Sequence, residues 1–397
     1  MEKLIEGFRR FRKEAFPVYE DLFRTRAHAR SPQTLSIGRS DSRVIPELLT
    51  QRQPRAGAGS DRMSTAAIRH ALRALASETG LRPGLSNVKL LRPLVAQAHE
   101  VLRERLEAGG SVEAYLRGRA RLADSALIGL LHFASVSSGI RGNSMIAPLA
   151  AVAIGGYGRR ELAPGSDLDL LFLLPESIQP KAADAMAACV NAVVSGLWDL
   201  GFVLDHAARS SGDCLDLARD EPAVLASLVD RRFLWGGFGL FAAMDADLAG
   251  LFSGPLAARW RSAVNSAMAS TPRDAVRGAR AQEDEPDVKR SPGGLRDLQR
   301  ALSANTLASG RPVTLVEPRL VEAHRFLWLV RCHLHLLAGR AEDRLSSTLQ
   351  PGVARQLGLD EPRGTNAVPR LLNLFRLHAH NVLQAAGCAR GNQPCTS

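Results

Sequence analysis

The sequence predicts an α+β protein, in which a small mixed sheet with its helices lies between two helical regions. Two observations lead to this fold class. Apolar residues recur at helical spacing over about 63–138 and again beyond 241, whereas short apolar runs closed by Gly or Pro occupy about 147–209. With 397 residues, of which 45% are apolar, the chain is long enough for two or three domains that each bury a core.

The N-terminal part is predicted to consist of an arm and a helical region. Residues 1–62 begin with one or two helices and then fill with Ser, Pro, Gly, Gln and Arg, which is typical of a linker. Residues 63–145 are expected to be helical, because apolar residues such as Leu91 and Leu94 fall on one face. The Gly-Gly-Ser sequence at 109–111 is expected to end one helix and cap the next.

Residues 146–240 are predicted to form the core that contains the sheet. The apolar runs are short, they stop at Gly or Pro, and a helical pattern separates the second run from the third. The expected strands are 149–154, 168–174 and 202–209, and the expected helices are Arg159–Leu162 and 181–200.

The chain is expected to return to helices over 241–386 and to end in a disordered tail at 387–397. One stretch, Asp287–Asp297, is too rich in Pro and Gly to be helical before Leu295. The helices expected in this region are 295–308, 317–340 and 367–386.

Charge and cysteine content exclude several classes of protein. The chain carries 51 Lys and Arg against 40 Asp and Glu, and the net charge of +11 favours anionic partners. Aromatic residues make up only 5%, and the basic residues are spread out, so nucleic acid is not expected as the main partner. Five cysteines without a Cys-x-x-Cys pair argue against a disulfide framework and a zinc site. Because no signal peptide or membrane-spanning run is seen, a cytoplasmic protein without a membrane partner is expected.

One segment carries a chemically informative pattern. Gly155 and Gly156 end the first apolar run, and the sequence Ser-Asp-Leu-Asp at 166–169 begins the second. On a strand, residues i and i+2 point to the same face, so Asp167 and Asp169 are expected to present two carboxylates side by side. Two adjacent anions repel each other and are costly to desolvate, so this arrangement indicates a bound cation.

The pattern predicts a site for Mg²⁺ and a nucleoside triphosphate. Mg²⁺ typically binds one or two carboxylates together with substrate phosphates, and a pair of such ions would activate a hydroxyl and steady the leaving pyrophosphate. Gly155 and Gly156 lack the Cβ atoms that would keep phosphate away from backbone N–H groups. Ser166 is expected to cap the turn or to donate to a phosphate. Each motif alone is common, so the prediction depends on their combination and spacing.

This segment resembles the nucleotidyltransferase domain of the bacterial PII uridylyltransferases, which attach UMP to a tyrosine of the nitrogen-signalling protein PII. Two further stretches are similar to motifs of that family, namely Asp287–Gln299 and Phe326–Leu345. The three motifs occur in the family's order and cover about 146–360. The resemblance implies a polymerase-β-like nucleotidyltransferase core followed by a helical uridylyltransferase-associated domain.

The resemblance also implies an activity and roles for individual residues. It implies Mg²⁺-dependent transfer of UMP from UTP to a tyrosine of a PII-type protein, with release of pyrophosphate. Asp167 and Asp169 match the catalytic metal carboxylates, and Gly155 and Gly156 match the phosphate loop. Lys289 and Arg296 lie in the second motif and are expected to neutralise triphosphate charge, with solvated cations at a helix start as an equal alternative.

The chain departs from the family in several places. Relatives of this fold place a third carboxylate on the next strand, and here Asp205 is available but is expected one position away from the required place, nearer Ala207. His206 matches a family histidine, for which a buried core imidazole is the expected role. Arg160 stands where a smaller residue is expected. No histidine precedes an Asp, so the uridylyl-removing HD domain, and the sensory ACT modules after it, are expected to be missing.

Two alternatives stay open beside the enzyme. The first is a regulator without catalytic activity, which binds nucleotide or PII through the same fold. The second is a basic nucleic-acid binder that uses the arm of residues 1–60, with 12 basic and 7 acidic residues.

Two features of the third motif carry structural expectations. His333 and His335 are two apart on a predicted helix and do not share a face, so they are not expected to bind a metal as a pair. A polar network is expected at the end of that helix, formed by Arg340, Glu342, Asp343 and Arg344.

Overall fold

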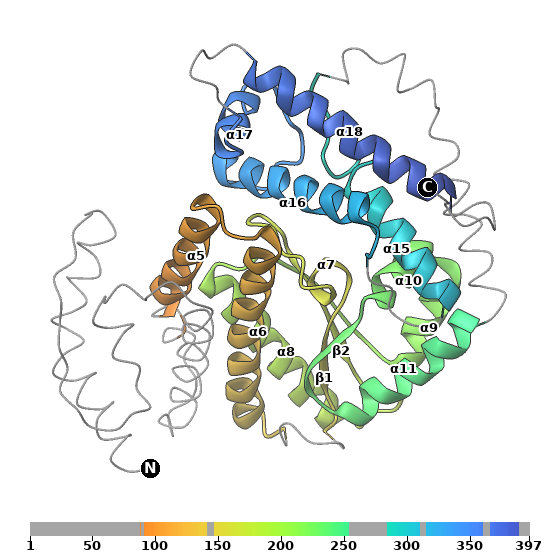
Figure 1. Ribbon diagram of the computed structural model, residues 1–397. Helices are drawn as coiled ribbons and strands as arrows, with labels where there is room; N and C mark the ends of the chain where they lie inside the picture. Colours follow the sequence, from red (N-terminus) through yellow and green to blue (C-terminus); the bar gives the residue numbers. More distant parts are fainter. Residues whose placement is uncertain are drawn as a thin grey trace, which may run out of the picture. The chain divides into compact units, whose positions relative to one another are not determined.

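The computed structural model describes residues 88, 91–140, 147–253, 284–309, 315–359 and 366–388 (Figure 1). These residues form helices and one small mixed sheet, so the predicted α+β class is confirmed. The predicted arm and linker at 1–62 lie outside the described residues, as does nearly all of the predicted tail at 387–397. Among the helices that the structure describes, none combines the length and apolar character that crossing a bilayer requires.

The chain divides into two compact units, each assembled from separate stretches. The first unit includes 121–147 and 178–202 and contains helix α8 (Pro180–Leu200) with the second half of helix α6 (Val112–Ser137). The two helices pack closely, because a Cβ on Gly196 would lie 2.7 Å from Leu130 Cδ2. The second unit contains the sheet and the C-terminal helices. The domain boundaries drawn along the sequence stay predictions.

The turn predicted at 109–111 is confirmed. Helix α5 (Arg92–Glu107) ends just before Gly109, whose φ of 86° lies in the left-handed region that favours glycine. Helix α6 then begins at Val112, and the Ser111 hydroxyl accepts a hydrogen bond from the Ala114 N–H at 3.3 Å.

The sheet has four strands in the order β3-β2-β1-β4. Strands β2 and β3 are parallel, as suits strands that a helix connects, and β1 is antiparallel to both β2 and β4. Three strands were predicted and the fourth was missed, although it is no shorter than β1. The strands are β1 (Ala150–Ala153), β2 (Leu168–Leu173), β3 (Leu204–Arg209) and β4 (Arg232–Gly236).

The prediction of a short helix at Arg159–Leu162 is wrong, because the helical turn lies four residues earlier in the chain. The helical turn is α7 (Gly155–Gly158), where the Gly158 N–H donates to the Ile154 carbonyl at 2.9 Å. Because glycines disfavour helices, this turn was not expected to include them. A Cβ on Gly158 would lie 1.7 Å from the Asp230 carbonyl oxygen, so the close contact with Asp230 requires glycine there.

One hydrophobic core joins the sheet to the helices that follow it (Figure 1). It combines residues of β1 and β2, such as Val152 and Leu171, with helix residues such as Leu225, Met244 and Ala304. The helices that contribute are α9 (Ser211–Asp220), α10 (Pro222–Val229), α11 (Phe238–Ser253) and α15 (Leu295–Ser309). This core fixes the sheet against α15, which starts within the second motif.

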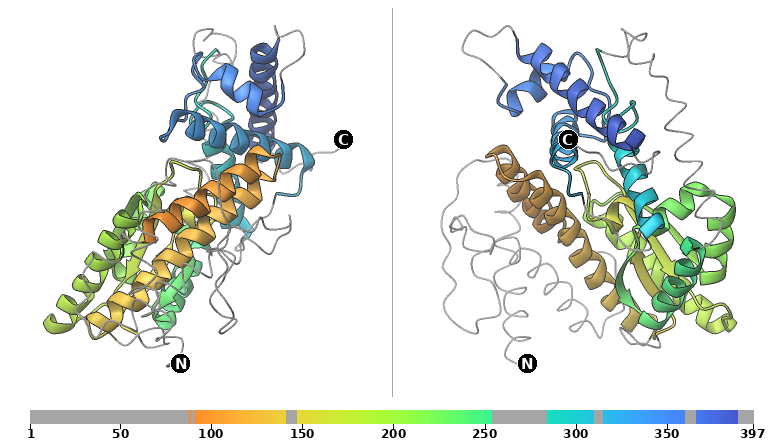
Figure 2. Two further views of the ribbon diagram at one scale, coloured as in Figure 1. Left: turned by 90° about the vertical axis from the view of Figure 1, so that its left-hand side faces the viewer. Right: turned by 45° about the vertical axis from the view of Figure 1, so that its right-hand side comes forward.

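The remaining C-terminal helices pack on one another, with α16 and α18 side by side in both views of Figure 2. The predictions for 295–308, 317–340 and 367–386 agree with α15, α16 and α18 to within a few residues. The short α17 was not expected. The helices are α16 (Pro318–Ala338), α17 (Gln350–Gln356) and α18 (Ala367–Cys388).

Candidate active site

Three aspartates lie at the start of the two parallel strands. Asp167 precedes β2 by one residue and Asp169 is its second residue. Asp205 on β3 is the direct partner of Asp169 in the parallel register, and Ala207 pairs with Leu171. Neighbouring strands are about 4.8 Å apart, and directly paired residues point to the same face, so Asp205 stands beside Asp169. The expectation that the third carboxylate of the fold belongs nearer Ala207 stays a prediction.

The glycine turn lies directly against these carboxylates. Gly155 has a φ of 55°, which favours glycine, and a Cβ there would lie only 3.0 Å from Asp169 Oδ2. The backbone joins the same two elements, since the Ile154 N–H donates to the Asp169 carbonyl at 3.1 Å. Gly156 follows in the turn, beside the guanidinium of Arg159. The structure thus brings the two halves of the sequence pattern together.

The carboxylate cluster is short of positive charge. Burial, and then the negative charges of Asp167 and Asp205, raise the pKa of Asp169 to about 6. Arg159 and Lys289 oppose this shift through their charges but do not cancel it. A bound cation would remove the repulsion among the three carboxylates, because an opposite charge within about 4–6 Å favours the ionised form.

The donor set fits a hard divalent ion. The clustered groups are carboxylate oxygens, which Mg²⁺ prefers, and such ions typically keep positions for waters and substrate phosphates. Within the described ranges, no three His, Cys, Asp or Glu side chains form a ready-made metal cluster. The residues that would hold Mg²⁺ are Asp167 and Asp169, with Asp205 beside them.

Lys289 approaches the carboxylates from the second motif. It is half-buried, and burial followed by the charge of Arg331 lowers its pKa, whereas the charge of Asp343 and, to a smaller extent, that of Asp167 raise it. Arg296 lies in the first turn of α15 and is exposed, with its N–H donating to the Lys289 carbonyl at 2.9 Å. Ser166 closes a backbone turn, its N–H donating to the Ala163 carbonyl at 3.0 Å.

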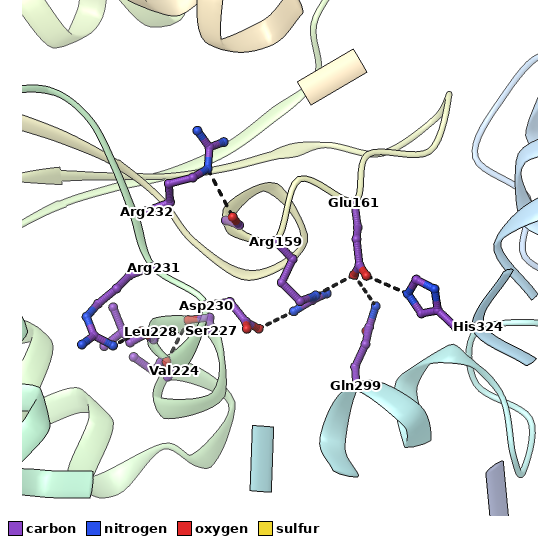
Figure 3. A network of polar contacts seen from close by, with 11 residues as sticks. Arg159, Glu161, Val224, Ser227, Leu228, Asp230, Arg231, Arg232, Gln299 and His324 are labelled. Carbon is purple, nitrogen blue, oxygen red and sulfur yellow. Dashed lines mark hydrogen bonds and ion pairs between the residues drawn. The ribbon is translucent and has the colours of Figure 1, made fainter. Parts of the chain in front are cut away.

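A buried polar network continues from the glycine turn (Figure 3). Arg159 forms ion pairs with Glu161, at 2.6 Å from Nε to Oε2, and with Asp230. Burial would raise the pKa of Glu161, but the charge of Arg159 and a hydrogen bond from His324 outweigh it and lower that pKa to about 2. For Asp230 the balance is opposite, and burial raises its pKa despite the ion pair with Arg159.

Two helices of the C-terminal region contact this network. His324 of α16 lies 2.8 Å from Glu161, measured from Nε2 to Oε1, and Gln299 of α15 donates to Glu161 Oε2 at 3.4 Å (Figure 3). The indole N–H of Trp328 donates to the same nitrogen of His324 at 3.0 Å, so Nε2 faces both a donor and the Glu161 carboxylate. The sequence analysis missed this network. Arg159 and Glu161 beside the glycines were its only local signal, since His324 is 163 residues further along the chain.

A second set of contacts holds the loop that leads to Asp167. The Gly165 N–H donates to His335 Nδ1 at 3.0 Å, and Arg119 of α6 donates to the Pro164 carbonyl at 2.9 Å. The other ring nitrogen of His335, Nε2, lies 3.2 Å from Asp343 Oδ1. Asp343 also accepts a hydrogen bond from Arg331 Nε at 2.7 Å.

The polar network predicted at the end of the α16 helix is present. Arg340 pairs with Glu342 at 2.6 Å, and the Arg344 N–H donates to Glu342 Oε1 at 3.1 Å. Asp343 belongs to a separate set of contacts, with Arg331 and His335, and His335 in turn contacts the loop before Asp167. The expectation for His206 is wrong, because its side chain is exposed on the edge strand β3, in contact with Phe172.

Comparison with known proteins gives two family matches. Residues 267–387 match the family described as GlnD PII-uridylyltransferase, and residues 96–210 match the nucleotidyltransferase family DUF294. The first covers α15, α16, α17 and most of α18, and the second covers β1, the glycine turn, β2 and β3.

Curated relatives carry names that agree with these families. The chain is 33% identical to the bifunctional uridylyltransferase/uridylyl-removing enzyme of Azospirillum brasilense over 328 residues, which are 76% of this chain and 33% of that protein. Proteins of the same name match from Phenylobacterium zucineum, at 33% identity (81% of this chain, 34% of that protein), and Novosphingobium aromaticivorans, at 30% (81% and 36%). The chain spans about a third of the length of these relatives. The resemblance predicted from the three motifs is confirmed.

Proposed function

Because the chain carries the nucleotidyltransferase core and the following helical region of the PII uridylyltransferase family, we propose that it transfers UMP from UTP to a tyrosine of a PII-type protein. The observation that carries this proposal is the close approach of the Gly155 turn to the Asp169 carboxylate, together with the pairing of Asp169 with Asp205 on the next strand. A nucleotidyltransferase needs a phosphate-binding turn next to metal carboxylates, and these residues supply both. A cytoplasmic location stays a prediction.

In the proposed reaction, the tyrosine oxygen forms a bond to the α-phosphorus of UTP, and the bond from that phosphorus to pyrophosphate breaks. The tyrosine proton leaves to a carboxylate of the cluster. Bound Mg²⁺ would lower the pKa of the attacking hydroxyl and stabilise the charge of the leaving pyrophosphate. The chain's own residues would hold the groups in place: Asp167 and Asp169 would bind the cations, and the N–H groups of the glycine turn would donate to phosphate.

Lys289 is the cation that best fits the triphosphate. It is half-buried near Asp167, so its charge acts in a less screened environment than that of exposed Arg296. We assign phosphate binding to Lys289 first and to Arg296 second, with Ser166 as a further donor. Each assignment can be tested by replacing the residue with alanine and measuring the KM for UTP, which is expected to rise.

Incubation with labelled UTP, Mg²⁺ and a PII protein tests the proposal. Label is expected on PII together with release of pyrophosphate. Asp167→Asn and Asp169→Asn are expected to abolish transfer, whereas the control Asp216→Asn, at an exposed position of helix α9, is expected to leave it unchanged. Absence of label with the unaltered chain, or full transfer by the Asp169 variant, would contradict the assignment.

One observation favours the alternative of a non-catalytic regulator. Arg160, two residues after the glycine turn, has a φ of 63°, which is unfavourable for residues other than glycine. A strained residue at this place is a departure from an optimal phosphate turn. Calorimetry that shows binding of Mg-UTP, with no pyrophosphate released in the presence of PII, would support the regulator.

A further inference from the structure

Helix α16 carries four side chains on one stripe that faces the site. His324, Trp328, Arg331 and His335 follow one another at intervals of four, three and four residues. Eleven residues turn a helix by three full turns plus about 20°, so the first and last of these side chains lie on the same face, about 16 Å apart along the axis. All four are buried or nearly so, and the guanidinium of Arg331 lies over the Trp328 ring at 5.2 Å.

The two histidines of this stripe contact the two ends of the segment that joins the glycine turn to the aspartates. At one end His324 contacts Glu161, which pairs with Arg159 beside Gly156. At the other end His335 accepts from the Gly165 N–H, two residues before Asp167. The helix therefore touches both halves of the site through one rigid element.

The state of His335 is fixed by its partners. The Gly165 N–H can only donate, so Nδ1 must carry a lone pair. The proton then lies on Nε2, which donates to Asp343. The ring is fully buried, with 0% of its side chain exposed, and Asp343 is in turn held by Arg331. This chain of contacts leaves His335 one orientation, in which its acceptor points to the loop.

The loop has little freedom to move away from this acceptor. A Cβ on Gly165 would lie 2.6 Å from the Ala341 nitrogen, so the loop backbone touches the segment after α16. The Arg119 guanidinium also donates to the Pro164 carbonyl. His335 thus supplies the hydrogen bond, and the absence of a side chain at 165 permits the approach.

We infer that His335 is a positioning residue, which sets the place of Asp167 by holding the Gly165 N–H while Asp343 fixes the imidazole. The inference rests on the proposed function for its kinetic consequence but not for its structural one. Through His324 and Glu161, the same helix holds the glycine turn, so α16 sets the separation between the phosphate-binding turn and the metal carboxylates.

Two isosteric substitutions separate the halves of this contact. Asparagine places an amide oxygen near the position of Nδ1, so His335→Asn keeps an acceptor for Gly165 and loses Asp343. Glutamine reaches the position of Nε2, so His335→Gln keeps the donor to Asp343 and loses the acceptor for Gly165. The matched controls are His333→Asn and His333→Gln, because His333 is equally buried on the same helix, with 2% of the residue exposed in both cases.

The first measurement is hydrogen exchange at the Gly165 amide, which needs no activity. Exchange is expected to rise about tenfold in His335→Gln, which leaves the N–H without its acceptor, and to stay near the unaltered rate in His335→Asn and in both His333 variants. Equal exchange in the Asn and Gln variants at 335, or a similar rise in the His333 variants, would overturn the inference.

The second measurement is the Mg²⁺ concentration that gives half-maximal transfer of UMP. It is expected to rise about 10–100-fold in His335→Gln, with a small change in the KM for UTP, and to change less than about threefold in His335→Asn. Gly165→Ala is expected to reproduce the glutamine variant without altering the histidine. An unchanged Mg²⁺ concentration for half-maximal transfer by an active His335→Gln protein would refute the kinetic part of the inference.

The two proposals fail in distinguishable ways. If the unaltered chain transfers no UMP to PII, the proposed function fails, and hydrogen exchange alone decides whether His335 holds the loop. Thermal unfolding of all variants completes the test. A positioning role predicts that His335→Gln and His333→Gln lose similar stability while only the former changes exchange at Gly165.

Discussion

The charge of Glu161 is expected to contribute about 3 kcal/mol to stability at pH 7, which Glu161→Gln would remove. Glutamine has the shape of protonated glutamate, so the substitution isolates the effect of ionisation. The pKa of Glu161 falls from 4.5 to about 2 in the folded protein. At about 1.4 kcal/mol per pKa unit, this difference corresponds to about 3 kcal/mol. The side chain is 15% exposed, too little for solvent to screen the effect away.

The same reasoning fixes the pH dependence. Glu161 is more acidic in the folded than in the unfolded protein, so its contribution is fully present above pH 4.5 and is lost as the pH falls through about 2. The difference in unfolding free energy between the unaltered chain and Glu161→Gln is therefore expected to shrink between about pH 5 and pH 2. Urea unfolding followed by circular dichroism at several pH values measures it.

Asp230→Asn is the matched control, because this carboxylate pairs with the same arginine. Folding raises the pKa of Asp230, so its charge is unfavourable in the folded protein, and asparagine is expected to cost little or nothing at pH 7. A loss below about 1 kcal/mol for Glu161→Gln, or a loss that is the same at all pH values, would refute the account of this network.

Three further substitutions have defined outcomes. Arg160→Gly is expected to raise the free energy of unfolding by about 0.5–1 kcal/mol, measured in urea, because it relieves a left-handed backbone. Gly158→Ala is expected to lower it by about 1–3 kcal/mol or more, since its Cβ would overlap the Asp230 carbonyl; an unchanged midpoint would contradict this contact. Asp205→Asn is expected to raise the Mg²⁺ concentration for half-maximal activity in the proposed transfer at least about tenfold, because it removes the carboxylate paired with Asp169; an unchanged Mg²⁺ concentration would exclude Asp205 from the proposed metal site.

The part of the site that the sequence could predict is the part that is local in the chain. Gly155, Gly156, Asp167 and Asp169 lie within fifteen residues, and the period of a strand places the two carboxylates together. The pairing of Asp205 with Asp169 could not be predicted, because the register of two parallel strands depends on the connecting helix and on packing, not on the strand's own residues. A hydrophobic pattern with both faces mixed, as in β3, gives no register signal.

The contacts from α16 could not be predicted for a different reason. His324 and His335 are spaced by eleven residues on a largely apolar helix, which indicates a shared face but names no partner. Their partners, Glu161 and Gly165, are 163 and 170 residues away in sequence. The spacing of these two histidines on a buried face was the available signal, and only the three-dimensional structure shows which residues they contact.

The contacts of α16 with Glu161 and Gly165 affect how this chain could be recombined with its relatives. A chimera could take the strands and the glycine turn from one relative and the helices from another. Its 161–165 loop would then face an α16 helix whose contact residues belong to a different protein. Exchange of the sheet alone is expected to give hybrids that fold but have low activity in the proposed transfer. Exchange of the sheet together with α15 and α16 keeps the loop and the helices that contact it from the same protein. A crossover point that keeps these contacts therefore lies after α16, not after the last strand.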